Sequence, residues 1–126
     1  MTIDTKHQVL YALYSEYQKD IPDMESINAA VLDMEVPVFN AALLKLQNEG
    51  YIQGFDWRPP ETMDARKIIS SYRKNIYLTR KGVEYVEKLA SIAESMPARK
   101  KIAELAKQVG LFGMDILKSF ILSQIT

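Results

Sequence analysis

Apolar side chains near the start of the chain recur at a helical spacing. Between Lys6 and Gln18 the large apolar residues lie three, one and three positions apart, which places them on one face of an amphipathic helix. Ile21-Pro22-Asp23 ends that helix, because the residue before a proline is pushed out of the helical region. The residues of the predicted apolar face are Leu10, Leu13, Tyr14 and Tyr17.

A second helix is predicted directly after that proline. Asp23 or Ser26 is a suitable N-cap, because a short side chain with an oxygen can accept a hydrogen bond from a free N–H of the first turn. This helix would end near residue 33, and its apolar residues would be Ile27, Ala30 and Val31.

The third predicted helix runs from Pro37 to Glu49. Proline favours the first helical turn, where its missing N–H has no helical partner in any case. Gly50 favours the left-handed conformation that ends a helix. The residues expected to face the core are Phe39, Ala42, Leu43 and Leu46.

The pattern changes from helical to extended after Gly50. Residues 51–57 are rich in aromatic side chains, which favours a strand. Residues 58–61 contain two prolines and must end it, because proline cannot donate to a sheet. A second extended segment, from Ile68 to Leu78, is expected to return and pair with the first.

The order of these elements predicts a winged helix-turn-helix. Thr79 is an N-cap for a fourth helix through Leu89, with Glu84 and Glu87 facing solvent. The hairpin would cover the open side of a core that three short helices cannot close. The predicted fold class is therefore mainly α with a small β-hairpin: a winged-helix domain over residues 1–94, followed by C-terminal helices over 95–126.

Three stretches carry a family resemblance: VLYALYSEYQ, VFNAALLKLQNEGYIQG and NIYLTRKGVEYVEKL. Together they resemble the YjcQ-type family of small winged-helix proteins from firmicute bacteria and their phages, over about residues 5–90. The glycine after the third helix and the later L-T-x-K-G pattern also occur in winged-helix regulators generally. The resemblance implies the fold and a bacterial or prophage setting, and it implies no reaction mechanism.

Composition and charge narrow the class of protein. The 126 residues suit one ordinary domain, and 16 basic residues balance 16 acidic ones. Residues 1–35 nevertheless contain seven acidic and two basic residues, whereas residues 65–81 contain six basic residues and no acidic one. Such a run creates a local positive field, which indicates either a phosphate-binding patch or a solvated hairpin surface.

The third helix is the expected major-groove reader, because the second helix of a helix-turn-helix motif enters that groove. Asn40 can read an adenine edge, and Ala41 or Val38 can touch a thymine methyl group. Lys45 can reach a phosphate. The residues predicted to face DNA are Val38, Asn40, Ala41, Leu44, Lys45 and Asn48.

The hairpin supplies the cations that this helix lacks. The predicted phosphate contacts are Arg66, Lys67, Arg73 and Lys74 on the wing, with Arg80 and Lys81 at the start of the fourth helix. The sequence therefore predicts a protein that binds double-stranded DNA, as a small transcriptional regulator of bacterial or prophage origin. The alternative is a protein-interaction adaptor, which an outward Val38 and Leu44 would serve on the same scaffold.

The C-terminal segment is unusually apolar. A helix beginning near Pro97 is expected to place Lys101 on its polar face, and glycines at 110 and 113 separate it from a last helix. Such a segment would leave an exposed patch on a small monomer, so burial in a symmetric homodimer is predicted. Packing on its own core and attachment to a membrane surface are the alternatives. The predicted dimer residues are Ile102, Leu105, Val109, Ile116, Leu117, Phe120 and Ile121.

Catalysis finds little support. The absence of cysteine excludes a thiol nucleophile, a disulfide and a zinc ribbon, and there is no Gly-rich phosphate loop. His7 is expected to be a surface side chain rather than a base or a ligand. We therefore expect no enzyme, no metal or other cofactor and no membrane insertion, and a cytoplasmic location.

Overall fold

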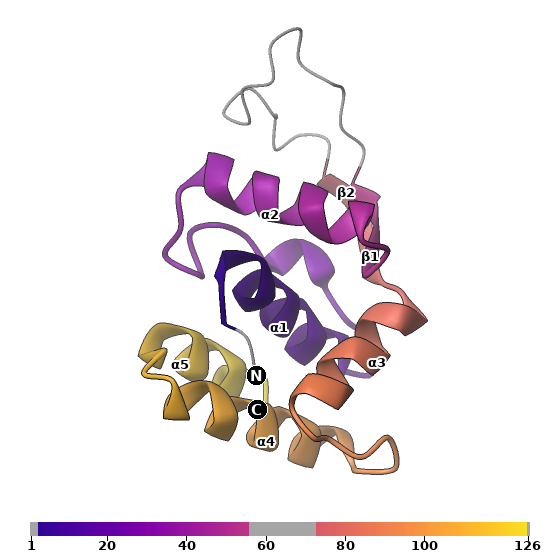
Figure 1. The fold of residues 1–126 in the computed structure, drawn as a ribbon, viewed down its shortest axis with the longest axis vertical. Helices are drawn as coiled ribbons and strands as arrows, with labels where there is room; N and C mark the ends of the chain where they lie inside the picture. Colours follow the sequence, from indigo (N-terminus) through magenta and orange to yellow (C-terminus); the bar gives the residue numbers. More distant parts are fainter. Residues whose placement is uncertain (1–2, 56–72, 126) are drawn as a thin grey trace, which may run out of the picture.

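The computed structural model describes residues 3–55 and 73–125, and it describes residues 73–75 by their backbone alone. These residues form five α-helices, one 3-10 turn and one antiparallel hairpin. The predicted fold class is confirmed: the layout is a winged helix followed by two C-terminal helices (Figure 1). In chain order the elements are α1 (Thr5–Tyr17), η1 (Met24–Ser26), α2 (Val36–Asn48), β1 (Ile52–Phe55), β2 (Arg73–Leu78), α3 (Arg80–Leu89), α4 (Ala98–Leu111) and α5 (Asp115–Ser123).

Helix α1 lies at the centre of the molecule (Figure 1). Asp4 is its N-cap, because the carboxylate accepts a hydrogen bond of 2.9 Å from the N–H of His7. Every residue from Val9 to Glu16 is buried, since α2, α3, α5 and β2 all contact this helix. The predicted position of the helix is confirmed. The predicted single apolar face is wrong, because α1 is covered on all sides.

The predicted second helix is wrong. Only residues 24–26 are helical, as a 3-10 turn, and Ser26 Oγ donates a hydrogen bond of 3.0 Å to the buried Glu16. The Asn28 side chain then accepts a hydrogen bond of 3.1 Å from the Val31 N–H, and local bonds of this kind compete with a helix. The segment buries Ile27, Ala29 and Leu32, whose spacing does not follow a helical face.

Helix α2 ends as predicted. Gly50 has a φ of 84°, and its N–H donates to the Gln47 carbonyl at 3.0 Å. The Tyr51 N–H donates to the Leu46 carbonyl, also at 3.0 Å, which completes a Schellman motif. The left-handed glycine therefore turns the chain directly from α2 into β1.

The side chain of Gln47 joins α2 to the hairpin. Ile52 lies opposite Leu78 in the antiparallel pair, and the register shifts between Gln53 and Phe55. The Gln47 amide donates to the Phe55 carbonyl and accepts from the Phe55 N–H, each at 2.7 Å. Gln47 thus bonds to the β1 backbone as a neighbouring strand would, and it sets the hairpin against the end of α2.

Helix α3 begins as predicted, because Thr79 Oγ1 accepts a hydrogen bond of 3.0 Å from the Gly82 N–H. Its solvent face differs from the prediction. Glu87 is buried, and its Oε2 accepts hydrogen bonds of 2.7 Å from the Tyr14 hydroxyl and from Lys101 Nζ. Lys101, also expected in solvent, is buried with it, because each charge satisfies the other.

The C-terminal helices pack on the chain itself. Helices α4 and α5 contact each other, and α5 contacts α1. Residues from 1–94 and from 95–126 share one hydrophobic core. Five predicted dimer residues belong to it and are not available to a second copy, which corrects that part of the predicted interface: Ile102, Leu105, Val109, Leu117 and Ile121.

We expect Lys101→Ala to lower the free energy of unfolding by about 3 kcal/mol, because it leaves the buried Glu87 carboxylate without its cation. Chemical denaturation followed by circular dichroism measures this loss. Lys100→Ala is the matched control, since Lys100 is the neighbouring lysine of α4 and is exposed. The control should change stability by less than about 0.5 kcal/mol, and equal effects would contradict the assignment.

Candidate nucleic-acid interface

Helix α2 presents one line of side chains to solvent. Val38, Ala41, Lys45 and Asn48 lie three, four and three positions apart, which puts them on one helical face. Val38, Lys45 and Asn48 are exposed, and Ala41 is half-buried. Figure 1 shows α2 at the end of the molecule opposite α4 and α5. The structure therefore keeps together four of the six residues predicted on this helix.

The other two residues predicted on this helix do not point outward. Asn40 is 1% exposed, which corrects the prediction that it reads an adenine. Leu44 is half-buried and packs against the core. The physical reason is that α2 packs against both α1 and β1, so its buried face is wider than the stripe of large apolar residues indicated.

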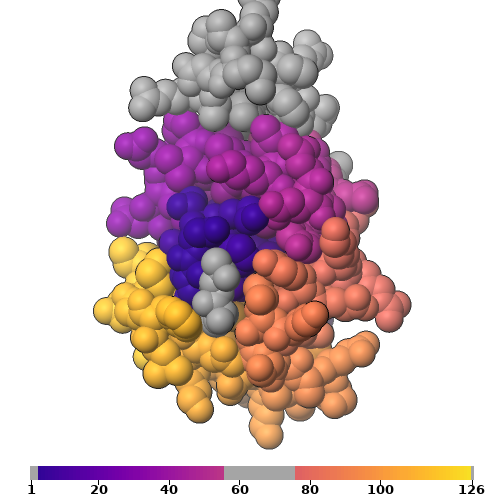
Figure 2. Space-filling model, viewed as in Figure 1, coloured from indigo at the N-terminus to yellow at the C-terminus, as the bar shows by residue number. Residues whose placement is uncertain are grey.

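A shallow hollow of about 240 Å³ separates α2 from the first turn of α1. Figure 2 shows these two segments side by side on one face of the molecule. The hollow brings Lys6 next to Val38 and Lys45. Sequence reasoning missed Lys6, because nothing in the local pattern links it to a helix that begins 30 residues later.

Cations gather at the C-terminal end of α2, and most of them have a protein partner. Lys6 Nζ lies 2.7 Å from the Glu49 carboxylate, and this hydrogen bond raises the pKa of Lys6. Lys81 Nζ donates to the Glu49 carbonyl at 2.8 Å and lies 5.2 Å from the centre of the Tyr51 ring. Lys45 has no ion-pair partner among the described residues.

Arg80 has a weaker attachment. Its Nε lies 3.0 Å from the Glu84 carboxylate, and the two side chains are 86% and 64% exposed. Ion pairs this exposed contribute little stability. Arg80 can therefore exchange Glu84 for a phosphate, whereas Lys81 is held at the negative end of the α2 dipole.

The remaining predicted cations cannot be placed. Arg66 and Lys67 lie outside the described residues. Arg73 and Lys74 lie in β2, of which the structure describes only the backbone at these positions. The basic wing stays a prediction.

His7 lies beneath this surface, not on it. It is 5% exposed, which corrects the prediction of a surface side chain. Its Nδ1 lies 2.6 Å from the Asp4 carboxylate and its Nε2 lies 2.7 Å from the Tyr85 hydroxyl, so both ring nitrogens are engaged. Tyr85 stacks on Tyr51 at 4.3 Å. This polar chain fixes the start of α1 to α3.

The pKa values around His7 reflect that role. Burial raises the pKa of Asp4, but its hydrogen bonds with the backbone and side chain of His7 outweigh that effect and lower the net value. Burial raises the pKa of Tyr85. No cluster of three or more His, Cys, Asp or Glu residues in the described ranges is arranged to hold a metal ion.

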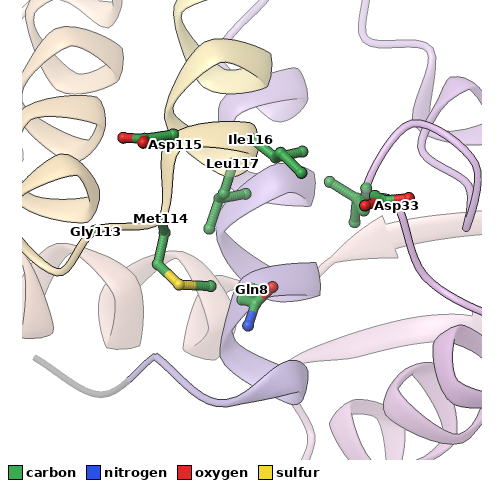
Figure 3. Close-up of a pocket in the computed structure, with 8 residues that line it drawn as sticks. Gln8, Asp33, Gly113, Met114, Asp115, Ile116 and Leu117 are labelled. Atoms are coloured by element: carbon green, nitrogen blue, oxygen red, sulfur yellow. The ribbon is translucent and has the colours of Figure 1, made fainter.

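A second hollow, of about 450 Å³, lies between α1, the turn before α2 and the start of α5. Figure 3 shows Gln8 between Met114 and Asp33, with Asp115 pointing away from Asp33. The lining contains two carboxylates and no basic residue, so it does not suit phosphate. None of the helices in the described part of the chain is long and apolar enough to cross a membrane.

Comparison with known proteins adds one finding. The model of the family described as YjcQ protein matches residues 7–105, which extends past the stretch that resembles this family by sequence motif. No curated protein and no solved structure matches the chain.

Asp4→Asn should cost less stability as the pH falls. The pKa of Asp4 is lowered in the folded state, so its charge stabilises the fold at pH values above its pKa in the unfolded chain, about 3.9. This contribution to stability is lost as the pH falls through the lower pKa of the folded state. Asparagine keeps the N-cap acceptor, which isolates the charge. Thermal unfolding of both proteins at pH 7 and pH 3 measures the difference. A constant difference would show that the charge plays no part.

Proposed function

The chain belongs to the YjcQ family, and from this premise we propose that it binds double-stranded DNA through the exposed face of α2. It would act in the cytoplasm as a small transcriptional regulator of bacterial or prophage origin, without catalysing a reaction. The observation that supports this most is the arrangement of Val38, Ala41, Lys45 and Asn48 in one line on the outer side of α2, three of them exposed, with Lys6 beside it.

The size and chemistry of this line suit a major groove. The groove is about 12 Å wide and accepts an α-helix. Ala41 and Val38 are small enough to allow close approach and can contact thymine methyl groups. Asn48 is the one amide on the line that can read a base edge, because Asn40 is buried. Binding would therefore depend mainly on phosphate contacts, and its affinity would fall steeply with salt.

Phosphate contacts can come from both sides of α2. Lys45 and Lys6 flank the hollow beside the helix, and Lys6 would exchange its Glu49 partner for a phosphate. Gln47 ties β1 to α2, and β2 pairs with β1, so the hairpin that carries Arg73 and Lys74 is fixed relative to the helix. Arg66 and Lys67 complete the proposed wing by sequence.

Self-association is the second part of the proposal. Ile116 is 56% exposed and Phe112 is 54% exposed, and both lie at the connection between α4 and α5. Leu111, the last residue of α4, is also exposed there. Exposed apolar side chains grouped in this way are typical of an interface. A two-fold dimer would present two α2 helices to paired half-sites.

A protein-interaction adaptor is the second candidate function. Two exposed valines on α2 favour it, Val36 at 51% and Val38 at 40%. Glu35 and Glu49 are exposed at the two ends of the helix and would repel phosphate. The adaptor would use Val38 on the same helix face, with Val36 at the start of the helix, and it would bind no nucleic acid.

Ala41→Glu should weaken DNA binding by at least about tenfold at 50 mM salt, because it places a carboxylate at the centre of the proposed contact. Fluorescence anisotropy with a labelled random duplex measures the affinity. Ala103→Glu is the matched control, since Ala103 is an exposed alanine of α4.

Lys45→Gln should reduce the salt dependence of the DNA affinity by about one counterion. If the wild-type chain binds no duplex at this salt concentration, the adaptor takes the place of the DNA-binding proposal.

Phe112→Ser combined with Ile116→Ser should convert a dimer into a monomer, as measured by multi-angle light scattering. The control is Ile21→Ser, because Ile21 is 88% exposed and lies elsewhere on the surface. A wild-type chain of monomeric mass, or a double variant that stays dimeric, would contradict the proposed interface.

A further inference from the structure

A third hollow lies at the opposite end of α1 from the candidate interface. It has a volume of about 430 Å³ and lies between the end of α1, the start of α4 and the end of α5. The 13 residues of α1 separate it from the hollow beside Lys6 by about 20 Å. Its volume falls within the range of small-molecule binding sites.

Gln124 points to a ligand in this hollow. The residue is 8% exposed and contributes to the lining. Its side-chain amide has no hydrogen-bond partner among the described residues. The amide is not fully enclosed by protein atoms, and glutamine can both donate and accept hydrogen bonds. The amide therefore offers hydrogen bonds to whatever fills the hollow.

The start of α4 supplies anion-binding groups on the same side. Pro97 is the N-cap and has no side chain that can accept a hydrogen bond from the first turn, so the N–H groups of Ala98, Arg99 and Lys100 have no cap. These groups form the positive end of a 14-residue helix. The Arg99 side chain also lines the hollow and forms no ion pair with a described residue.

The rest of the lining limits the kind of ligand. Ile102 and Ile125 provide an apolar wall. Lys19 is paired with Glu16 at 3.1 Å, so its charge is largely balanced. Asp20 is an exposed carboxylate at the rim and opposes an anion. The groups left to bind an anion are therefore the Arg99 guanidinium and the N-terminus of α4, beside the apolar wall of Ile102 and Ile125.

We propose that this hollow binds a small organic anion with a short apolar body. Its carboxylate or phosphate group accepts hydrogen bonds from the first turn of α4 and from Arg99, and the Gln124 amide bonds to the same head group. The apolar body lies against Ile102 and Ile125. This binding site is separate from the α2 face, and it does not depend on DNA binding.

Titration of the full ¹⁵N-labelled chain with butanoate, and separately with inorganic phosphate, tests the proposal by NMR. Saturable shifts of the backbone amides of Arg99 and Lys100 and of the Gln124 side chain are expected with at least one probe. The probe that binds more tightly identifies the head group. Arg99→Gln should weaken binding about tenfold, because it removes a charge-assisted hydrogen bond. Lys107→Gln, at an exposed lysine farther along α4, should leave it unchanged.

Two further variants separate a binding site from a structural feature. Asp20→Asn should tighten binding about two- to threefold, because it removes a repelling charge that is screened by solvent. Gln124→Met keeps the volume, and it should weaken binding without lowering the midpoint of thermal unfolding, since the amide has no protein partner.

Three results would overturn the proposal. Shifts that do not saturate, or that spread over surface lysines and persist in Arg99→Gln, would mean an adventitious ion only. Weaker binding by Asp20→Asn would mean that Asp20 supports the bound probe and does not repel it, which contradicts the proposed arrangement. A lower unfolding midpoint in Gln124→Met would mean that this amide serves the fold.

Discussion

The fold depends on the burial of α1 along most of its length. Residues Val9 to Glu16 are all buried, which requires neighbours on every side of a single helix. Helices α2, α3 and α5 and strand β2 supply them. A helix of this kind loses solvent on all faces, so its polar groups must find partners inside the protein. The positions of the other elements follow from that requirement.

Those partners come from elements that are distant in the sequence. Tyr14 bonds to Glu87 of α3, and Glu87 in turn holds Lys101 of α4. At the start of the same helix, His7 bonds to Tyr85 of α3. Glu16 bonds to Ser26 near its end. These directional contacts determine which elements lie against α1, whereas apolar burial alone is tolerant of their exact placement.

The candidate sites lie where this packing ends. The α2 face and the hollow beside Lys6 lie at the first turn of α1, and the anion-binding hollow lies beyond its last turn. The covered middle of α1 offers no surface. The buried helix α1 therefore separates two candidate sites. The α2 face suits a large partner, and the hollow beside Gln124 suits a small ligand.

The sequence alone determined the positions of α1, α2 and α3 and the change to strands after Gly50. It also determined the glycine that ends α2 and the threonine that begins α3. Hydrophobic periodicity and helix capping depend on residues only a few positions apart, so both can be identified from the sequence. The tertiary structure decided the burial of Asn40, His7, Glu87 and Lys101. It also decided the absence of the second helix, the position of Lys6 beside the candidate interface and the packing of α5 on α1. Each of these depends on a contact between segments far apart in the chain, and a side chain takes its surroundings from those contacts rather than from its neighbours in sequence.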